Sequence, residues 1–174
     1  RTAEKIRAAE AEASAYVIDR RRWYHAHPEV AYEERATTAQ ICADLDALGI
    51  PYERPTATGV VATIRGRAAG AYGQDGSPRR RLMLRADIDA LPVTEQTGEP
   101  FCSLIEGRMH ACGHDCHIAM LLGAARLLAS MTDELAGEVR LVFQPAEEGG
   151  NGSKTMIEAG VLEGVDGVYG MHIW

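Results

Sequence analysis

The segment RLMLRADID, residues 81–89, is the best guide to the fold. Residues 81–86 read as a short buried strand, and the acidic pair Asp87 and Asp89 follows at its carboxyl end. Pro92 stops the strand soon afterwards, because proline cannot donate a backbone hydrogen bond to a neighbouring strand. Ligands of open α/β sheets bind beyond the carboxyl ends of the strands, so the pair marks a candidate site.

Helix and strand patterns alternate on both sides of this segment. Apolar residues at spacings of three and four predict helices at residues 3–24, 33–48, 114–128 and 153–159. Further strands are predicted at residues 59–65, 138–143 and 168–173, and the glycine-rich residues 66–79 read as a loop or hairpin tip. This alternation predicts an α/β fold, in which one three-layer domain has a mainly parallel sheet flanked by helices.

The composition is that of a soluble protein with one hydrophobic core. The chain has 174 residues, 46% hydrophobic and 25% charged, and no apolar run reaches the roughly 20 residues of a membrane-spanning helix. Acidic residues outnumber basic ones 25 to 18, and the net charge of −7 argues against nucleic acid or an anionic membrane as a partner. A small-molecule substrate is therefore expected.

Cysteine usage and the two ends of the sequence add expectations about location and completeness. Four cysteines are few for a secreted disulfide scaffold of this length, so we expect reduced thiols. Residues 1–22 are polar and amphipathic and lack the apolar core of a signal peptide, which favours the cytoplasm. The sequence starts at Arg1 without a methionine and stops at Trp174 within an apolar stretch, so we expect a fragment.

Residues 109–117, MHACGHDCH, are rich in side chains that bind metals. Cys112 and His114 are separated by one glycine, whose permissive backbone lets both donors approach one centre. Thiolate and imidazole suit zinc or another first-row divalent ion. Taken alone, the segment also allows the reading of a polar, packed loop.

Two more strand ends carry residues of the same kinds. Glu147 and Glu148 follow the strand at residues 138–143, where one carboxylate can face a metal and the other a bound water. Metal-assisted hydrolysis needs both roles, because the ion lowers the pKa of water towards roughly 7 and a carboxylate removes the proton. Alone, the pair also fits an exposed acidic loop, and His172 also fits a hydrogen-bonded core histidine. The convergence of these strand ends on one crevice favours the metal site.

With these motifs in this order, the chain resembles the aminoacylase-type metallopeptidases, in the branch of hippurate hydrolases, indoleacetyl-amino-acid hydrolases and N-acyl-amino-acid amidohydrolases. The resemblance covers nearly the whole chain and is carried by RWYHAHPE at 22–29, LRADIDALP at 84–92, MHACGHD at 109–115, FQPAEEG at 143–149 and GMH at 170–172. It implies a metal-dependent amidohydrolase that cleaves the amide bond of N-acyl amino acids, hippurate-like or related, with water activated by a two-metal centre.

The same resemblance assigns roles to individual residues. It implies Glu147 as the catalytic base and two divalent ions, Zn, Mn, Co or Ni, bound by Cys112, His114, Glu148 and His172. It also implies that residues 1–174 form the N-terminal portion of the catalytic domain. A further histidine ligand, the C-terminal part of that domain and an inserted lid and dimerisation domain then lie outside the sequence, and the parent protein is expected to be a homodimer.

Three aspartates are expected to support the ligands rather than bind the ions. The wider superfamily often has His-x-Asp where this chain has Asp87-Ile-Asp89, so Asp87 replaces a metal-binding histidine. Asp87 and Asp89 are interpreted as residues that orient the ligands or shape the strand end, and Asp115 as a helix-end carboxylate or an acceptor for a ligating histidine. His110 and His117 flank the site without an assigned role.

Two other classes of protein compete with the enzyme. In the first, the same residues serve a non-catalytic module stabilised by one structural ion with a closed set of four ligands. In the second, the truncated chain is inactive and no longer holds metal well. Glu147 distinguishes the first class from an enzyme, because a structural site has no use for a second carboxylate beside an open position.

Overall fold

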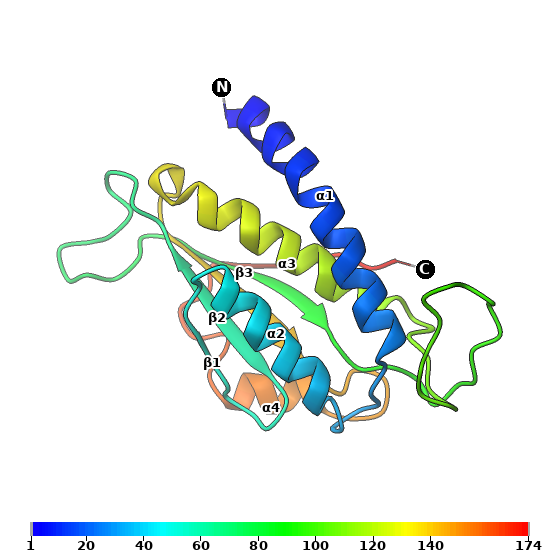
Figure 1. The fold of residues 1–174 in the computed structure, drawn as a ribbon. Helices are drawn as coiled ribbons and strands as arrows, with labels where there is room; N and C mark the ends of the chain where they lie inside the picture. Colours follow the sequence, from blue (N-terminus) through cyan, green and yellow to red (C-terminus); the bar gives the residue numbers. More distant parts are fainter. Residues whose placement is uncertain (1, 174) are drawn as a thin grey trace.

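A computed structural model describes residues 2–173 of the chain (Figure 1). Its helices are α1 (Thr2–Ala26), α2 (Arg35–Ala47), α3 (His114–Ser130) and α4 (Gly152–Glu158), with a 3-10 turn at Thr132–Glu134. Its strands are β1 (Tyr52–Glu53), β2 (Val60–Arg65), β3 (Arg81–Asp87), β4 (Glu138–Gln144) and β5 (Gly167–Gly170). All the predicted helices and strands form, and the structure adds β1 and the 3-10 turn.

The strands form one mixed sheet in the order β1-β2-β4-β3-β5. The pairs β3–β4 and β3–β5 are parallel, whereas β2–β4 and β1–β2 are antiparallel. In the parallel part, Asp87 at the end of β3 lies opposite Gln144 at the end of β4, and Arg85 lies opposite Gly170 at the end of β5. The three segments that follow these strands therefore leave the sheet at the same edge.

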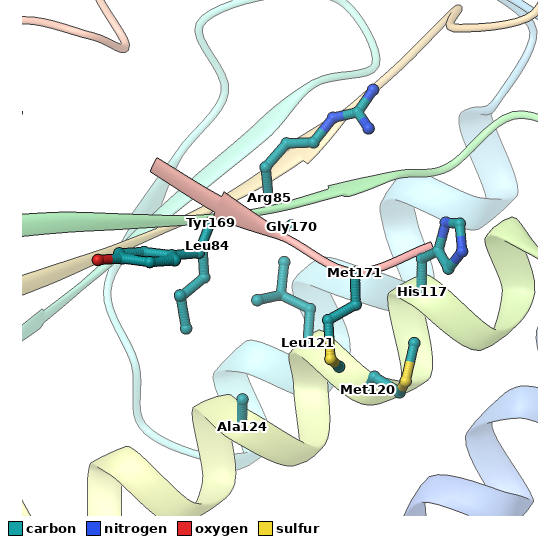
Figure 2. Close-up of a pocket in the computed structure, with 9 residues that line it drawn as sticks. All are labelled: Leu84, Arg85, His117, Met120, Leu121, Ala124, Tyr169, Gly170 and Met171. Carbon is teal, nitrogen blue, oxygen red and sulfur yellow. The ribbon is translucent and has the colours of Figure 1, made fainter. Parts of the chain in front are cut away.

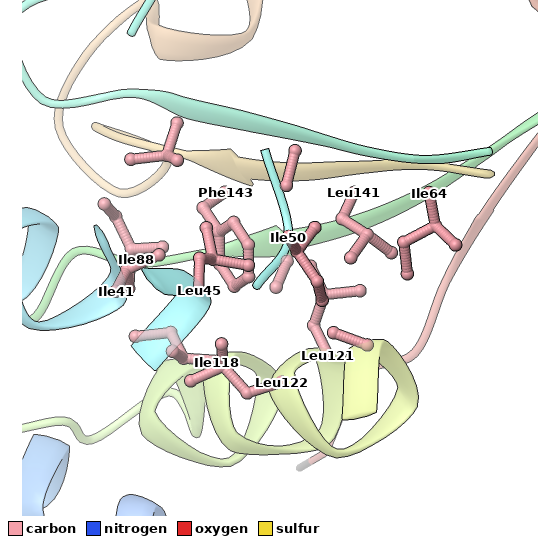
Figure 3. Packing of buried hydrophobic residues seen from close by; sticks show 14 of the residues in the cluster. Ile41, Leu45, Ile50, Ile64, Ile88, Ile118, Leu121, Leu122, Leu141 and Phe143 are labelled. Carbon is pink, nitrogen blue, oxygen red and sulfur yellow. The ribbon is translucent and has the colours of Figure 1, made fainter. Parts of the chain in front are cut away.

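Helices cover both faces of the sheet, which gives the predicted three layers (Figure 1). On one face, α2 and α3 pack on β2, β3 and β4 around a cluster that includes Ile41, Leu45, Ile118, Leu141 and Phe143, and α1 packs on α3 (Figure 3). On the other face, Met156 of α4 packs against strand residues that include Val61 and Val142. The alternation of inward and outward side chains along β2 and β4 thus supplies both cores.

One boundary of the sequence analysis is wrong. The strand predicted for residues 168–173 ends at Gly170, because the chain then turns towards α3. The Ile173 backbone N–H donates to Nε2 of His117 at 2.9 Å, a side chain of α3, instead of to a neighbouring strand. The described helices include none whose length and apolar character suit a membrane crossing.

Candidate metal centre

The edge where β3, β4 and β5 end collects side chains that bind metals. Three groups of potential ligands lie here, and within each group the ligand atoms are within 4.8 Å of one another. The groups are Cys112, His114 and His172; Asp87, His114 and His117; and His114, Glu147 and Glu148. All five residues predicted as ligands or base are therefore brought together, with His114 common to every group.

His114 is oriented so that one ring nitrogen faces this cluster. It is the first residue of α3 and follows Gly113, whose φ of 81° lets the loop turn into the helix. Its Nδ1 donates to the backbone oxygen of Asp89 at 2.8 Å, which leaves Nε2 as the acceptor nitrogen. Nε2 is buried and has no hydrogen-bond partner among residues 2–173.

The surroundings of His114 Nε2 fit a divalent ion. Carboxylate oxygens of Asp87, Glu148 and Glu147 lie 3.6, 3.7 and 3.8 Å from it. These distances are too long for hydrogen bonds, but two donors bound to one ion at about 2.1 Å in tetrahedral geometry lie about 3.4 Å apart. A cation between these atoms would satisfy a buried nitrogen that has no hydrogen-bond partner in the described part of the chain.

Cys112 and His172 complete the cluster from the loop before α3 and the segment after β5. Cys112 Sγ lies 3.8 Å from His172 Nε2, and the His172 side chain is exposed. A hydrogen bond to Glu148, partial burial and the nearby carboxylates together raise the pKa of the Cys112 thiol to about 11. A bound cation has the opposite effect on a thiol, and a set of thiolate, imidazole and carboxylate suits zinc and related ions.

The two glutamates differ in exposure. The Glu147 side chain is 42% exposed, whereas that of Glu148 is 23% exposed. The Glu148 backbone N–H donates to Asp89 Oδ2 at 2.9 Å, which fixes the turn that carries both side chains. The arrangement gives one carboxylate on the solvent side of the ligand cluster and one within it.

The three aspartates expected to support the ligands are placed differently. Asp89 bonds to both His114 and Glu148, as described above. Asp87 accepts from His117 Nδ1 at 2.6 Å and from Arg85 at 2.7 Å. Burial by itself opposes ionisation of Asp87, but the hydrogen bond from His117 and the charges of His114 and Arg85 leave its pKa below the usual value.

Asp115 lies outside the three ligand groups, although it is next to His114 in sequence. Its Oδ2 accepts from His25 Nδ1 at 2.8 Å and pairs with Arg21 at the same distance. The structure therefore shows Asp115 bound to α1 and supporting no predicted ligand. His110 is also outside the groups, and its burial lowers its pKa to about 4.

Two residues without a predicted role lie in or beside the cluster. His117 belongs to one ligand group, and its three-residue spacing from His114 on a helix is the signal that marks it. Glu34 accepts a hydrogen bond from the Ala146 backbone at 2.8 Å, just before the two glutamates. The sequence carries no local signal for this second contact, because it joins residues 112 positions apart.

An apolar cavity of about 300 Å³ lies beside the cluster, between β5 and α3. Figure 2 shows Met171, from the segment after β5, lying over Met120 and Leu121 of α3. His117 also lines this cavity, but none of the predicted ligands does. The ligand cluster therefore lies next to this cavity and not inside it.

Comparison with known proteins identifies relatives of the whole described fold. Residues 83–174 match the sequence profile of Peptidase family M20/M25/M40. The chain is 50% identical over 158 residues to N-acetyl-L-cysteine deacetylase of Bacillus subtilis, covering 90% of this chain and 36% of that protein. It is 46% identical over 174 residues to thermostable carboxypeptidase 1 of Saccharolobus solfataricus, covering 98% of this chain and 42% of that protein.

A solved structure agrees with the sequence matches. The Bacillus subtilis YXEP protein, described as a dinuclear metal binding peptidase from the M20 family, superposes with a TM-score of 0.85 at 43% sequence identity. The superposition covers 94% of this chain and 44% of that chain. The chain thus spans less than half the length of each of these relatives.

Proposed function

Because the chain belongs to Peptidase family M20/M25/M40, we propose that the complete protein is a metal-dependent amidohydrolase. Its proposed reaction is hydrolysis of the amide bond of N-acyl amino acids, hippurate-like or related, at a two-metal centre. The observation that carries the proposal is the buried Nε2 of His114, which has no hydrogen-bond partner among residues 2–173, in a side chain common to three groups of potential ligands. The relative named N-acetyl-L-cysteine deacetylase supports the substrate class.

The proposed ligands are those that meet at the edge of the sheet. Zn, Mn, Co or Ni would be held by Cys112, His114, Glu148 and His172, and the dinuclear description of the similar solved structure supports two ions. Bound divalent ions supply Lewis acidity, which polarises an amide carbonyl and lowers the pKa of water to near 7. The bond from His114 Nδ1 to the Asp89 backbone oxygen fixes the imidazole ring, so that Nε2 would be available to a bound ion.

Glu147 is the proposed base, because its carboxylate borders the ligand atoms and is the more exposed of the pair. It takes a proton from the attacking water and delivers it to the amide nitrogen as the bond to the acyl carbon breaks. The products are a carboxylic acid and an amino acid with a free amine. Proton transfer of this kind contributes about 10²–10⁴-fold to rate.

The proposal extends to the organisation of the complete protein. Residues 1–174 would form the N-terminal portion of the catalytic domain, since the chain spans 36–44% of the relatives described above. The remainder would supply the C-terminal part of that domain, a further histidine ligand, and a lid domain through which two copies form a homodimer. A small-molecule substrate then binds between these parts.

The test is performed on the complete protein. Metal content is measured by elemental analysis, and hydrolysis is measured with N-acetyl-L-amino acids, N-benzoylglycine and blocked dipeptides. We expect Glu147→Gln to keep native metal content and to lose about 10²–10⁴-fold in kcat. Glu158→Gln, at a 63% exposed position in α4, is the matched control and should behave like the native protein.

Three outcomes contradict parts of the proposal. An active Glu147→Gln variant removes Glu147 from its role. Bound metal without hydrolysis of any of these substrates favours a structural ion instead. Cleavage of the blocked dipeptides alone favours a peptide substrate, in line with the relative named carboxypeptidase, over an N-acyl amino acid.

A further inference from the structure

Glu34 is a fully buried carboxyl that the proposed reaction does not use. Its exposed fraction is 0%, and burying a carboxyl is unfavourable unless the group is well paired. It occupies the position before α2, but its side chain makes no capping hydrogen bond to that helix. Instead, Oε1 accepts from the Ala146 backbone N–H at 2.8 Å. The contact is therefore directed at the Glu147 turn, by which we mean residues 145–148.

Ala146 is held in a conformation that alanine rarely adopts. Its φ is 51°, in the left-handed region, and Tyr32 at 65° is the other non-glycine residue with positive φ among residues 2–173. Tyr32 also contacts the chain after the Glu147 turn: its hydroxyl accepts a hydrogen bond from the Asn151 backbone N–H at 2.9 Å. The loop before α2 is thus bonded to the chain on both sides of the two glutamates, through Glu34 and Tyr32.

Two buried carboxylates bind the backbone on either side of Glu147. Glu34 accepts the N–H of Ala146, and Asp89 accepts the N–H of Glu148. Asp89 is 1% exposed, and the bond to Glu34 is buried whereas the bond to Asp89 is partly buried. With the peptide groups fixed before and after it, the direction in which the Glu147 side chain leaves the backbone is also fixed.

We propose that Glu34 is a positioning residue for this hydrolase: its carboxylate holds Ala146 in the left-handed conformation and so directs Glu147 at the reacting atoms. This inference rests on the proposed function for its effect on catalysis. The bond between Glu34 and the Ala146 amide is a separate physical claim that needs no activity to be tested. Misplacing a catalytic group by about 1 Å lowers the rate by about 10²-fold.

Two substitutions at Glu34 separate the effect of its side-chain length from the effect of its charge. Glu34→Gln keeps an oxygen that can accept from Ala146 and removes the charge. Glu34→Asp keeps the charge, but is one methylene shorter and cannot reach the same N–H. In the complete protein we expect Glu34→Gln to retain near-native kcat, and Glu34→Asp to lose about 10²-fold in kcat with little change in KM.

Metal content, and amide exchange that changes at Ala146 but not across the rest of the chain, provide readouts that a general loss of stability would not mimic. Because Glu148 keeps its bond to Asp89, Glu34→Asp should bind the native amount of metal. Hydrogen exchange at the Ala146 amide should accelerate in Glu34→Asp and stay slow in Glu34→Gln. Glu29→Gln is the control, since Glu29 accepts two backbone N–H groups at the start of α2 at 3.1 and 2.8 Å and does not contact the Glu147 turn.

Several results would overturn the role of Glu34. One is a native kcat in Glu34→Asp. Another is a loss of kcat in Glu34→Gln or in Glu29→Gln that equals the loss in Glu34→Asp. The last is a native rate of hydrogen exchange at the Ala146 amide in Glu34→Asp. If Glu34→Asp does not fold, the comparison is made in the Ala146→Gly background, because glycine adopts positive φ without strain. In that background Glu34→Asp should again lower kcat. A kcat equal to that of the Ala146→Gly single variant contradicts the proposal. An inactive native protein would refute the proposed function, while the exchange rates would still test the bond.

Discussion

Replacing His117 tests how the candidate metal centre is held together. The His117 Nε2 accepts the Ile173 backbone N–H at 2.9 Å, so Nδ1 carries the ring proton and donates it to Asp87 at 2.6 Å. Both nitrogens are therefore used within the protein, although His117 lies within range of a ligand group. The bond to Ile173 ties the segment after β5 to α3, and the neighbouring His172 is carried on that segment.

The size of the effect follows from these two hydrogen bonds. His117→Phe removes one bond to a carboxylate, about 1.5–3 kcal/mol, and one to a backbone N–H, about 0.5–1.5 kcal/mol, so the expected loss of stability is about 2–4.5 kcal/mol. Residues that orient metal ligands also contribute about 10–100-fold to metal affinity. We therefore expect His117→Phe to weaken metal binding by the complete protein about 10–100-fold.

Competition with a chromogenic chelator measures this affinity, and two conservative variants separate the two bonds. His117→Gln keeps an acceptor for Ile173, whereas His117→Asn keeps a donor for Asp87. If the hydrogen bond between Ile173 and residue 117 positions His172, the His117→Gln variant retains a higher metal affinity than the His117→Asn variant. His27→Gln removes a half-buried imidazole that stacks on a tryptophan and should leave the affinity unchanged. Native affinity in His117→Phe, or better retention by asparagine than by glutamine, refutes the reasoning.

Three further predictions concern the ligands, the turn and the buried histidine next to α3. Cys112→Ser should lose at least one ion per chain in elemental analysis, because a neutral hydroxyl is a much weaker ligand than a thiolate. Gly152→Ala places a Cβ 1.6 Å from a backbone oxygen and should lower stability by about 1–3 kcal/mol in thermal unfolding, while Gly149→Ala, with its nearest contact at 3.7 Å, should be tolerated. The hydrogen bond to Asp115 raises the pKa of His25, so NMR titration of its ring should give a midpoint above about 6.5. Its contribution to stability is then complete below about pH 6.5 and lost as the pH rises through the folded-state pKa; a midpoint at or below 6.5 contradicts this.

The sequence predicted the elements that have a strong local pattern. Periodic apolar residues located α1 to α4, and buried runs located β2, β3 and β4, because period and composition are local properties. The two-residue strand β1 is too short to have a period, and it is defined by its pairing with β2. The end of β5 was placed too late because the bond that draws Ile173 out of the sheet comes from α3, 56 positions away in sequence.

Helix geometry explains why Asp115 takes the first of its two predicted roles, a carboxylate in the first turn of α3, and why His117 had no assigned role. Successive residues on a helix point about 100° apart, so Asp115 faces away from His114 and meets His25 of α1. The residue three positions after His114 returns to the same side, which places His117 beside Asp87. Proximity in sequence was therefore a poor guide on this helix, and the three-residue spacing a better one.

The use of each carboxylate inside the protein indicates which ones are free to react. Asp89 and Glu34 accept backbone N–H groups, and Asp87 is bonded to Arg85 and His117. The Glu147 carboxylate, by contrast, accepts no hydrogen bond from residues 2–173, and one of its oxygens lies 3.8 Å from His114 Nε2. The contacts that fix the Glu147 turn therefore leave the Glu147 carboxylate free to bond to the attacking water, and any variant that supplies it with a new donor should lower kcat without displacing the metal.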